Sequence, residues 1–170
     1  MDSTESWIRR SRGFVGLDGL VGLDGGVPVA LTRDEREQFL AEPHVAALAV
    51  DSAEEGRAPL TVPIWYQYEP GGDLWIMTGR DSRKGRLIGA AGRFSLMVDR
   101  LTPTVRYVSV EGPVVSTLPA TREQLVEISS RYLPAEKVEA YVDFAWKEHG
   151  EQVVIHMRPQ RWLSSDLGGF

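Results

Sequence analysis

Apolar and polar residues alternate in short runs along most of the chain, and this alternation predicts β-strands. Segments rich in Gly and Pro, such as PGG at 70–72, separate several of the runs and are typical of tight turns. We therefore expect consecutive antiparallel strands, with neighbours joined by hairpins. The six runs are 44–51 (HVAALAVD), 59–69 (PLTVPIWYQYE), 73–79 (DLWIMTG), 94–100 (FSLMVDR), 104–116 (TVRYVSVEGPVVS) and 151–165 (EQVVIHMRPQRWLSS), and the last of them is expected to form one strand or two.

Helical patterns occupy most of the remaining chain. Thr32 and Glu35 have the spacing of a capping box, and so do Thr121 and Gln124. Ser82 is a candidate N-cap for a short helix that follows the third strand. The four expected helices lie within 32–43, 82–93, 121–133 and 135–149.

Six strands with short helices predict a mainly β, α+β fold, an antiparallel six-stranded barrel with helical decoration. At 170 residues the chain is long enough for one domain with a real core. We expect that domain to span 31–170. Residues 1–30 are rich in Gly, contain VGLDG at 15–19 and again at 21–25, and read as an arm outside the domain.

Composition excludes several classes of protein. The chain has no cysteine, which removes disulfides, thiolate nucleophiles and Cys-ligated metals. No apolar run is long enough to span a bilayer, and the N-terminus does not read as a secretory signal, so a cytoplasmic protein without membrane partners is expected. A net charge of −5 argues against a general nucleic-acid surface. His44, His149 and His156 are far apart, so no metal site is predicted.

One cationic cluster stands out in this acidic chain. The segment 78–87 (TGRDSRKGRL) holds four cations between Arg80 and Arg86. If a helix begins at Ser82, Arg83 and Lys84 lie in its first turn, where the helix dipole disfavours cations and favours an anion such as phosphate. The alternative is a solvated basic turn without a ligand.

The cluster and a second motif together resemble the flavin-binding split β-barrel superfamily that includes the pyridoxamine 5′-phosphate oxidases. A bulky strand ending in Thr78 precedes the S-R-K segment, and RYVSVEG at 106–112 matches the family pattern R-x-V-x-x-E-G. The resemblance covers about 32–116 and the final RPQRWL at 158–163. It implies a split barrel, a flavin-type cofactor and an oxidoreductase that moves a hydride or two electrons to or from a small organic substrate.

The resemblance also implies roles for particular residues. Arg83 and Lys84 would hold the cofactor phosphate, with hydroxyl contacts from Ser82 and Thr78. Tyr107 stands where the oxidases commonly place a Gln against the cofactor. No catalytic residue is assigned. The complete expected cofactor shell is Val62, Pro63, Ile64, Trp65, Met77, Thr78, Ser82, Arg83, Lys84, Arg86 and Tyr107.

The C-terminal segment MRPQRWLSSDLGGF does not reproduce the Arg/His substrate signature of the true oxidases, so pyridoxamine phosphate is not the expected substrate. FMN is the first expected cofactor, and the deazaflavin coenzyme F-420 is the alternative because Arg80 and Arg86 would suit its additional carboxylates. The resemblance further implies a homodimer with the cofactor at the subunit interface. A non-catalytic flavin- or haem-binding carrier or sensor, and a barrel without any cofactor, remain alternatives.

Overall fold

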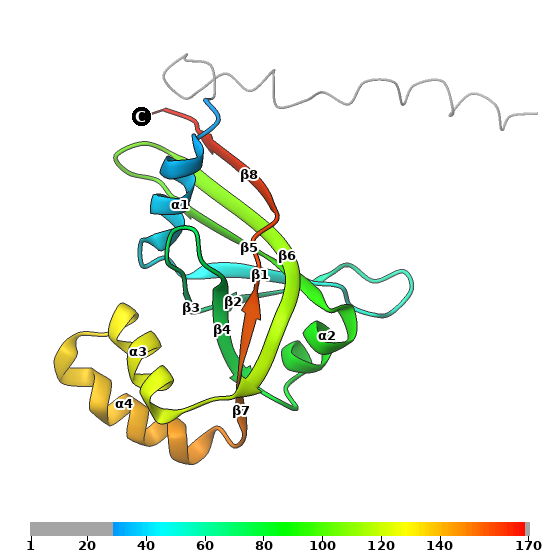
Figure 1. The fold of residues 1–170 in the computed structure, drawn as a ribbon, viewed down its shortest axis with the longest axis vertical. Helices are drawn as coiled ribbons and strands as arrows, with labels where there is room; N and C mark the ends of the chain where they lie inside the picture. The colour runs from blue at the N-terminus through cyan, green and yellow to red at the C-terminus, as the bar shows by residue number, and fades with distance from the viewer. Residues whose placement is uncertain (1–28, 169–170) are drawn as a thin grey trace, which may run out of the picture.

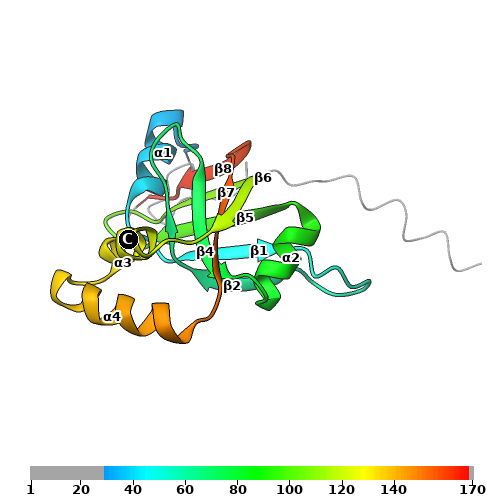
Figure 2. The same ribbon diagram turned by 60° about the horizontal axis from the view of Figure 1, so that its bottom comes forward.

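The computed structural model describes residues 29–168, so the expected arm lies outside the described residues except for Val29 and Ala30. The described chain forms one curled antiparallel sheet with helices around it (Figures 1 and 2). The helices are α1 (Arg33–Ala41), α2 (Arg83–Ala91), α3 (Arg122–Tyr132) and α4 (Ala135–Glu148). The strands are β1 (Ala46–Val50), β2 (Leu60–Ile64), β3 (Tyr66–Gln67), β4 (Leu74–Gly79), β5 (Arg93–Arg100), β6 (Arg106–Pro119), β7 (Gln152–Met157) and β8 (Arg161–Asp166).

The sheet is built around β6, the long strand that curves through the middle of Figure 1. The strand order is β2-β1-β5-β6-β7-β4-β3, and β8 also pairs with β6. The first part of β6, from Arg106 to Glu111, pairs with β8, whereas the part from Val114 to Pro119 pairs with β7. Because β6 belongs to both halves of the sheet, it sets the curl that encloses the core.

Gly112 lies at the point where β6 passes from one partner to the other. The backbone N–H of Arg158 donates to Pro113 at 3.0 Å, and that of Gln160 donates to Glu111 at 3.0 Å, so the β7–β8 connection is bonded on both sides of Gly112. A Cβ atom on Gly112 would overlap the carbonyl of Arg158. Only glycine permits this approach of two backbones.

The mainly β fold with short helices is confirmed, but the strand count differs from the prediction. Two of the six predicted runs each form two strands within the described chain. The run 59–69 divides at Trp65, because β2 pairs with β1 while β3 pairs with β4. The run 151–165 divides at 158–160 beside Gly112. Both breaks are corners of the curled sheet. The alternation of apolar and polar residues does not reveal such corners.

The connections between strands also correct the prediction. Hairpins join β1 to β2, β3 to β4 and β5 to β6. By contrast α2 leads from β4 to β5, and the pair α3 and α4 joins the neighbouring strands β6 and β7. The helical starts were predicted correctly: the side chains of Thr32, Ser82 and Thr121 cap α1, α2 and α3.

Apolar side chains form two clusters. The main core fills the curled sheet, where α1 contributes Phe39 and Leu40 and α2 contributes Ile88. The second cluster lies between the two helices α3 and α4 and the sheet, where Trp65 and Met77 pack against them. The two helices therefore cover one side of β3 and β4, as their position in Figures 1 and 2 also shows.

Polar contacts fix α3 on the barrel. The Tyr66 hydroxyl donates to the carbonyl of Leu40 at 2.7 Å, and burial raises the pKa of Tyr66 well above its usual range. Arg131 of α3 lies over the Tyr66 ring and donates to the carbonyl of Glu42 at 2.6 Å. The Tyr132 hydroxyl accepts from the backbone N–H of Tyr66 at 3.1 Å. These bonds satisfy backbone groups at the end of α1 and at the corner between β2 and β3.

Within residues 29–168, none of the helices has the length and apolar character needed to cross a bilayer.

We predict that Gly112→Ala lowers the free energy of unfolding by about 3 kcal/mol, because the clashing atom is a backbone carbonyl held by hydrogen bonds. Gly89→Ala is the matched control: no atom lies within 4 Å of a Cβ there, and Ala favours the α2 interior. Urea unfolding of both variants measures the difference. Equal stabilities of Gly112→Ala and the parent would contradict the close crossing.

Candidate functional site

The candidate site lies where β4 ends and α2 begins. The Thr78 hydroxyl lies 3.1 Å from the Ser82 hydroxyl, and the Ser82 side chain accepts from the backbone N–H of Gly85 at 3.0 Å. Ser82 therefore ends the turn after β4 and starts the helix. The first turn of α2 contains no acidic residue to complement the positive end of the helix dipole.

Gly85 holds this helix start close to the preceding turn. A Cβ atom at Gly85 would lie 2.6 Å from the carbonyl oxygen of Gly79 and 2.9 Å from that of Arg80. The glycine in SRKGR therefore lets the first turn of α2 pack directly on the end of β4. Gly85 was not among the expected site residues, although a glycine inside a predicted helix is a signal of close packing.

Two of the four cations already have close partners within the chain. The Arg80 side chain pairs with Glu151 at 2.7 Å across the β4–β7 edge. The Arg86 guanidinium bonds the backbone carbonyl of Asp81. Both contacts are exposed to solvent, so each stabilises the fold only slightly.

Arg83 and Lys84 have weaker contacts with the rest of the chain than Arg80 and Arg86 have. Arg83 reaches only Glu54, at 4.0 Å, and both side chains are about half exposed. Lys84 is half-buried, no hydrogen bond or ion pair within residues 29–168 involves its ammonium, and burial lowers its pKa. A partly desolvated cation beside a helix N-terminus is unfavourable on both counts. An anion bound between Arg83 and Lys84 would offset both costs.

The structure brings together only part of the expected cofactor shell. Thr78, Ser82, Arg83, Lys84 and Arg86 lie in one segment at the start of α2. The other members lie elsewhere in the fold. Trp65 and Met77 pack against α3 and α4, and Ile64 is in the main core with Val62 at its edge. Pro63 lies on β2 and Tyr107 on β6.

Trp65 illustrates this separation. Its ring stacks on Tyr132 with centroids 4.9 Å apart and planes within 7°, and it also contacts Tyr141.

Tyr107 is separated in another way, because it lies near the start of β6, where it pairs with Ser165 of β8. The cation pair follows Gly79, which pairs with Gln152 of β7, and Gln152 lies beside the far end of β6, where its carbonyl accepts from the backbone N–H of Ala120. Within one chain, Tyr107 and the cation pair therefore lie apart.

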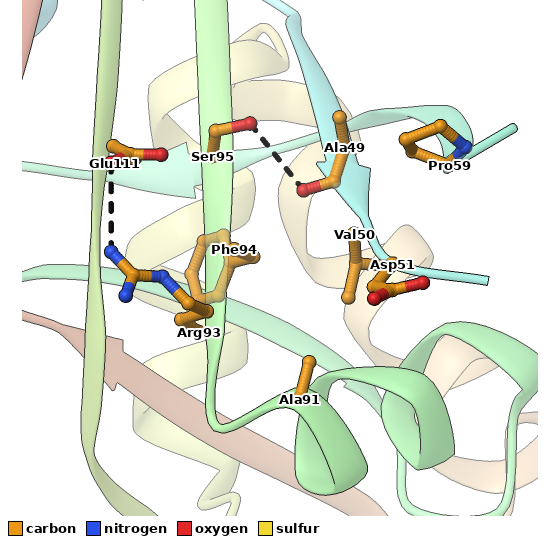
Figure 3. A pocket seen from close by; sticks show the side chains of 9 residues that line it. All are labelled: Ala49, Val50, Asp51, Pro59, Ala91, Arg93, Phe94, Ser95 and Glu111. Carbon is orange, nitrogen blue, oxygen red and sulfur yellow. Dashed lines mark hydrogen bonds and ion pairs between the residues drawn. The ribbon is translucent and has the colours of Figure 1, made fainter. Parts of the chain in front are cut away.

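A cleft of about 450 Å³ lies beside the other end of α2. Figure 3 shows Ala91 of α2 below it, Ser95 and Arg93 on β5, and Glu111 on β6 facing Arg93 at 3.5 Å. None of the eleven expected residues lines this cleft. Its far wall includes Asp51 from the loop between β1 and β2.

That loop was missed by the sequence analysis. It places Glu54 beside Arg83 and Asp51 at the cleft, so two carboxylates border the cationic helix start and the cleft. No motif marks them, because the loop reaches α2 only through the tertiary fold. Among residues 29–168 no group of three or more His, Asp or Glu side chains is arranged to hold a metal.

The curled antiparallel sheet with its helices defines a split β-barrel. The sequence profile described as pyridoxamine 5′-phosphate oxidase matches residues 32–166. The chain belongs to this family, which confirms the resemblance seen in its motifs. A search among curated proteins finds no match.

Solved structures share the fold at low sequence identity. An F420 reductase is 22% identical with a TM-score of 0.58, over 75% of this chain and 94% of that one. An FAD-binding protein from Mesorhizobium loti is 17% identical with a TM-score of 0.53, over 82% and 96%. A heme-binding protein from Mycobacterium smegmatis is also 17% identical with a TM-score of 0.53, over 82% and 60%. At these identities the likeness concerns the fold.

We predict that Lys84→Met raises the free energy of unfolding of the cofactor-free protein at pH 7. Burial places the folded-state pKa of Lys84 below its ordinary value of 10.5, so the protonated lysine opposes folding, and this cost fades as pH rises through the lowered pKa. The difference in free energy of unfolding between Lys84→Met and the parent should therefore become smaller toward alkaline pH. Urea unfolding from pH 7 to pH 10 measures it.

Lys137→Met is the matched control, because Lys137 is an exposed lysine in the first turn of α4 and should change stability by no more than about 0.5 kcal/mol. A loss of stability in Lys84→Met would contradict the interpretation that the charge of Lys84 is uncompensated in the folded protein.

Proposed function

We propose that this protein binds a flavin-type cofactor, with the phosphate on the first turn of α2, and acts as an oxidoreductase on a small organic substrate. The observation that carries the proposal is the half-buried Lys84, which stands with Arg83 at a helix start without an acidic residue in its first turn. Membership of the oxidase family and the likeness to an F420 reductase and an FAD-binding protein support it.

FMN is the proposed cofactor, ahead of coenzyme F-420. Arg83 and Lys84 are the cations of this segment without a close partner among the described residues, since Arg80 pairs with Glu151, Arg86 donates to a backbone carbonyl, and Arg83 lies 4.0 Å from Glu54. Two adjacent cations and the free N–H groups of one helix start match a single phosphate. The additional carboxylates of F-420 would have to displace the existing partners of Arg80 and Arg86.

The chain's own part in the chemistry is binding and orientation. FMN, when bound, supplies a ring that takes up and returns a hydride or two electrons. Arg83 and Lys84 would hold the phosphate, Ser82 and Thr78 would offer hydroxyl contacts, and Gly85 keeps these groups in place against the end of β4. No side chain is assigned a proton-transfer role.

A second copy of the chain is part of the proposal. One row of residues crosses five strands on the outer face of the sheet: Pro63 opposes Ala47, Ala47 opposes Met97, Met97 opposes Ser109, and Ser109 opposes Leu163. We call it the outer-face row. Met97, on the interior strand β5, is 39% exposed, and Leu163, on the edge strand β8, is 51% exposed, so two large apolar side chains of this row face outward.

Two clefts lie along the outer-face row, and side chains of a second protein surface would fill them. One of about 310 Å³ lies beside Pro63 and Met97, and another of about 330 Å³ lies beside Ser109 and Leu163. A symmetric dimer would bury this apolar row against itself. Tyr107 lies away from the helix start within one chain, so a cofactor held between two copies would allow residues of both to contribute to its shell.

We predict that the double variant Arg83→Ala/Lys84→Ala binds FMN at least about 100-fold more weakly, because two charge-assisted contacts to phosphate are lost. The matched control is Arg80→Ala/Arg86→Ala, which removes two cations of the same segment and should change the affinity by less than about 5-fold. Quenching of FMN fluorescence on titration measures both.

Unchanged FMN affinity in Arg83→Ala/Lys84→Ala would overturn the phosphate site. An equal loss in the control variant, together with tighter binding of F-420 than of FMN, would assign the deazaflavin instead. The absorption spectrum of the purified protein separates flavin from haem, and reduction of the bound flavin by organic donors separates an enzyme from a carrier.

We predict that Met97→Lys gives a monomer and lowers cofactor affinity at least about 10-fold, because an unpaired charge would be buried in the proposed interface. Light scattering after size exclusion gives the mass. Phe144→Lys changes an exposed apolar residue on α4, far from the outer-face row, and should remain dimeric. A dimer that persists in Met97→Lys would place the interface elsewhere.

A further inference from the structure

A second polar crevice lies on another part of the molecule, away from α2. It has a volume of about 300 Å³ and lies between α1, the turn from β3 to β4, and the connection from β7 to β8. We call it the α1 crevice. Figures 1 and 2 both show α1 at one end of the barrel and α2 on a different flank, so the crevice is separate from the proposed phosphate site.

Three arginines line the α1 crevice, and two of them have acidic partners. Arg33 pairs with Glu37 at 2.8 Å, and Arg158 pairs with Asp73 at 3.2 Å. Among the described residues, Arg36 forms no ion pair and no side-chain hydrogen bond. The lining therefore has one positive charge in excess, and it belongs to Arg36.

Arg36 is also held in place. Its guanidinium carbon lies 4.9 Å from the centroid of the Trp162 ring, a cation–π contact that restrains the group. The Arg36 Nε atom is buried and has no hydrogen-bond partner. A buried donor without an acceptor costs free energy, and such a group calls for a water, an ion or a ligand that supplies one.

We propose that the α1 crevice binds the carboxylate group of a small organic acid, with Arg36 as the recognising residue. A carboxylate accepts two parallel N–H bonds from a guanidinium and neutralises one charge. The Trp162 ring beside Arg36 gives the crevice an aromatic wall, which suits an acid with a flat apolar part.

The local charges favour a carboxylate over a phosphate. Glu37 and Asp73 remain in the lining, and a phosphate dianion would bring two negative charges against a single excess positive charge. A monoanion balances the charge of the crevice. The site thus differs in its ligand from the proposed site on α2, where Lys84, which has no partner among the described residues, and the weakly paired Arg83 lie in the first turn of a helix.

The test follows the indole N–H resonance of Trp162 by NMR during titration with benzoate, after assignment with Trp162→Phe. The expected result is a saturable shift with a dissociation constant of about 1–10 mM, the range of a single charged contact in a small ligand. Benzamide has the same shape without the charge and should give no saturable shift. Inorganic phosphate should bind more weakly than benzoate.

Arg36→Gln should weaken benzoate binding at least about 10-fold, and Arg36→Lys, which keeps the charge but not the planar fork, should weaken it less. Arg122→Gln is the matched control, because Arg122 is a paired surface arginine at the α3–α4 end of the molecule. It should leave binding unchanged.

Absence of a saturable shift with benzoate, an equal response to benzamide, tighter binding of phosphate, or unchanged binding in both Arg36 variants would each overturn the proposal. The readout does not involve a flavin, and the titration can be repeated in Arg83→Ala/Lys84→Ala. Success or failure here is therefore independent of the proposed function on α2.

Discussion

The shape of the sheet depends on one close crossing of two backbones, where β6 passes the connection between β7 and β8 at Gly112. Hydrogen bonds from Arg158 and Gln160 hold the crossing on both sides of the glycine. This contact lets one long strand pair with β8 along its first part and with β7 along its second. The curl that results encloses the main core and sets the outer-face row on the opposite side of the sheet.

The helix start on α2 is a place where folding and binding make opposite demands. Folding alone would favour acidic residues in the first turn of a helix and would keep Lys84 in water. The structure instead has a half-buried Lys84 beside Arg83, while Gly85 fixes the turn beneath them. Such local conflicts with folding rules concentrate at functional sites. The unpaired Arg36 in the α1 crevice is a second conflict of the same kind, with a different balance of charge.

Much of the fold and one part of the candidate site could be predicted from the sequence. The N-caps Thr32, Ser82 and Thr121 and most of the strands depend on neighbours within a few residues, and the structure has them as predicted. The division of the run 59–69 at Trp65 could not be predicted, and the number of strands in 151–165 stayed open, because both depend on which distant strand each half pairs with. Trp65 itself was assigned to the cofactor shell, whereas its ring stacks on Tyr132, which is remote in sequence.

The sequence by itself determined the antiparallel barrel class, the family and the cationic helix start at Ser82, since these follow from local periodicity, capping chemistry and short motifs. Only the tertiary structure decided which cations are already satisfied. Arg80 meets Glu151 and Arg83 approaches Glu54 through contacts between segments that are distant in sequence. Burial and charge pairing are properties of such long-range contacts, so Lys84 and Arg36 could be distinguished from ordinary surface cations only once the chain was folded.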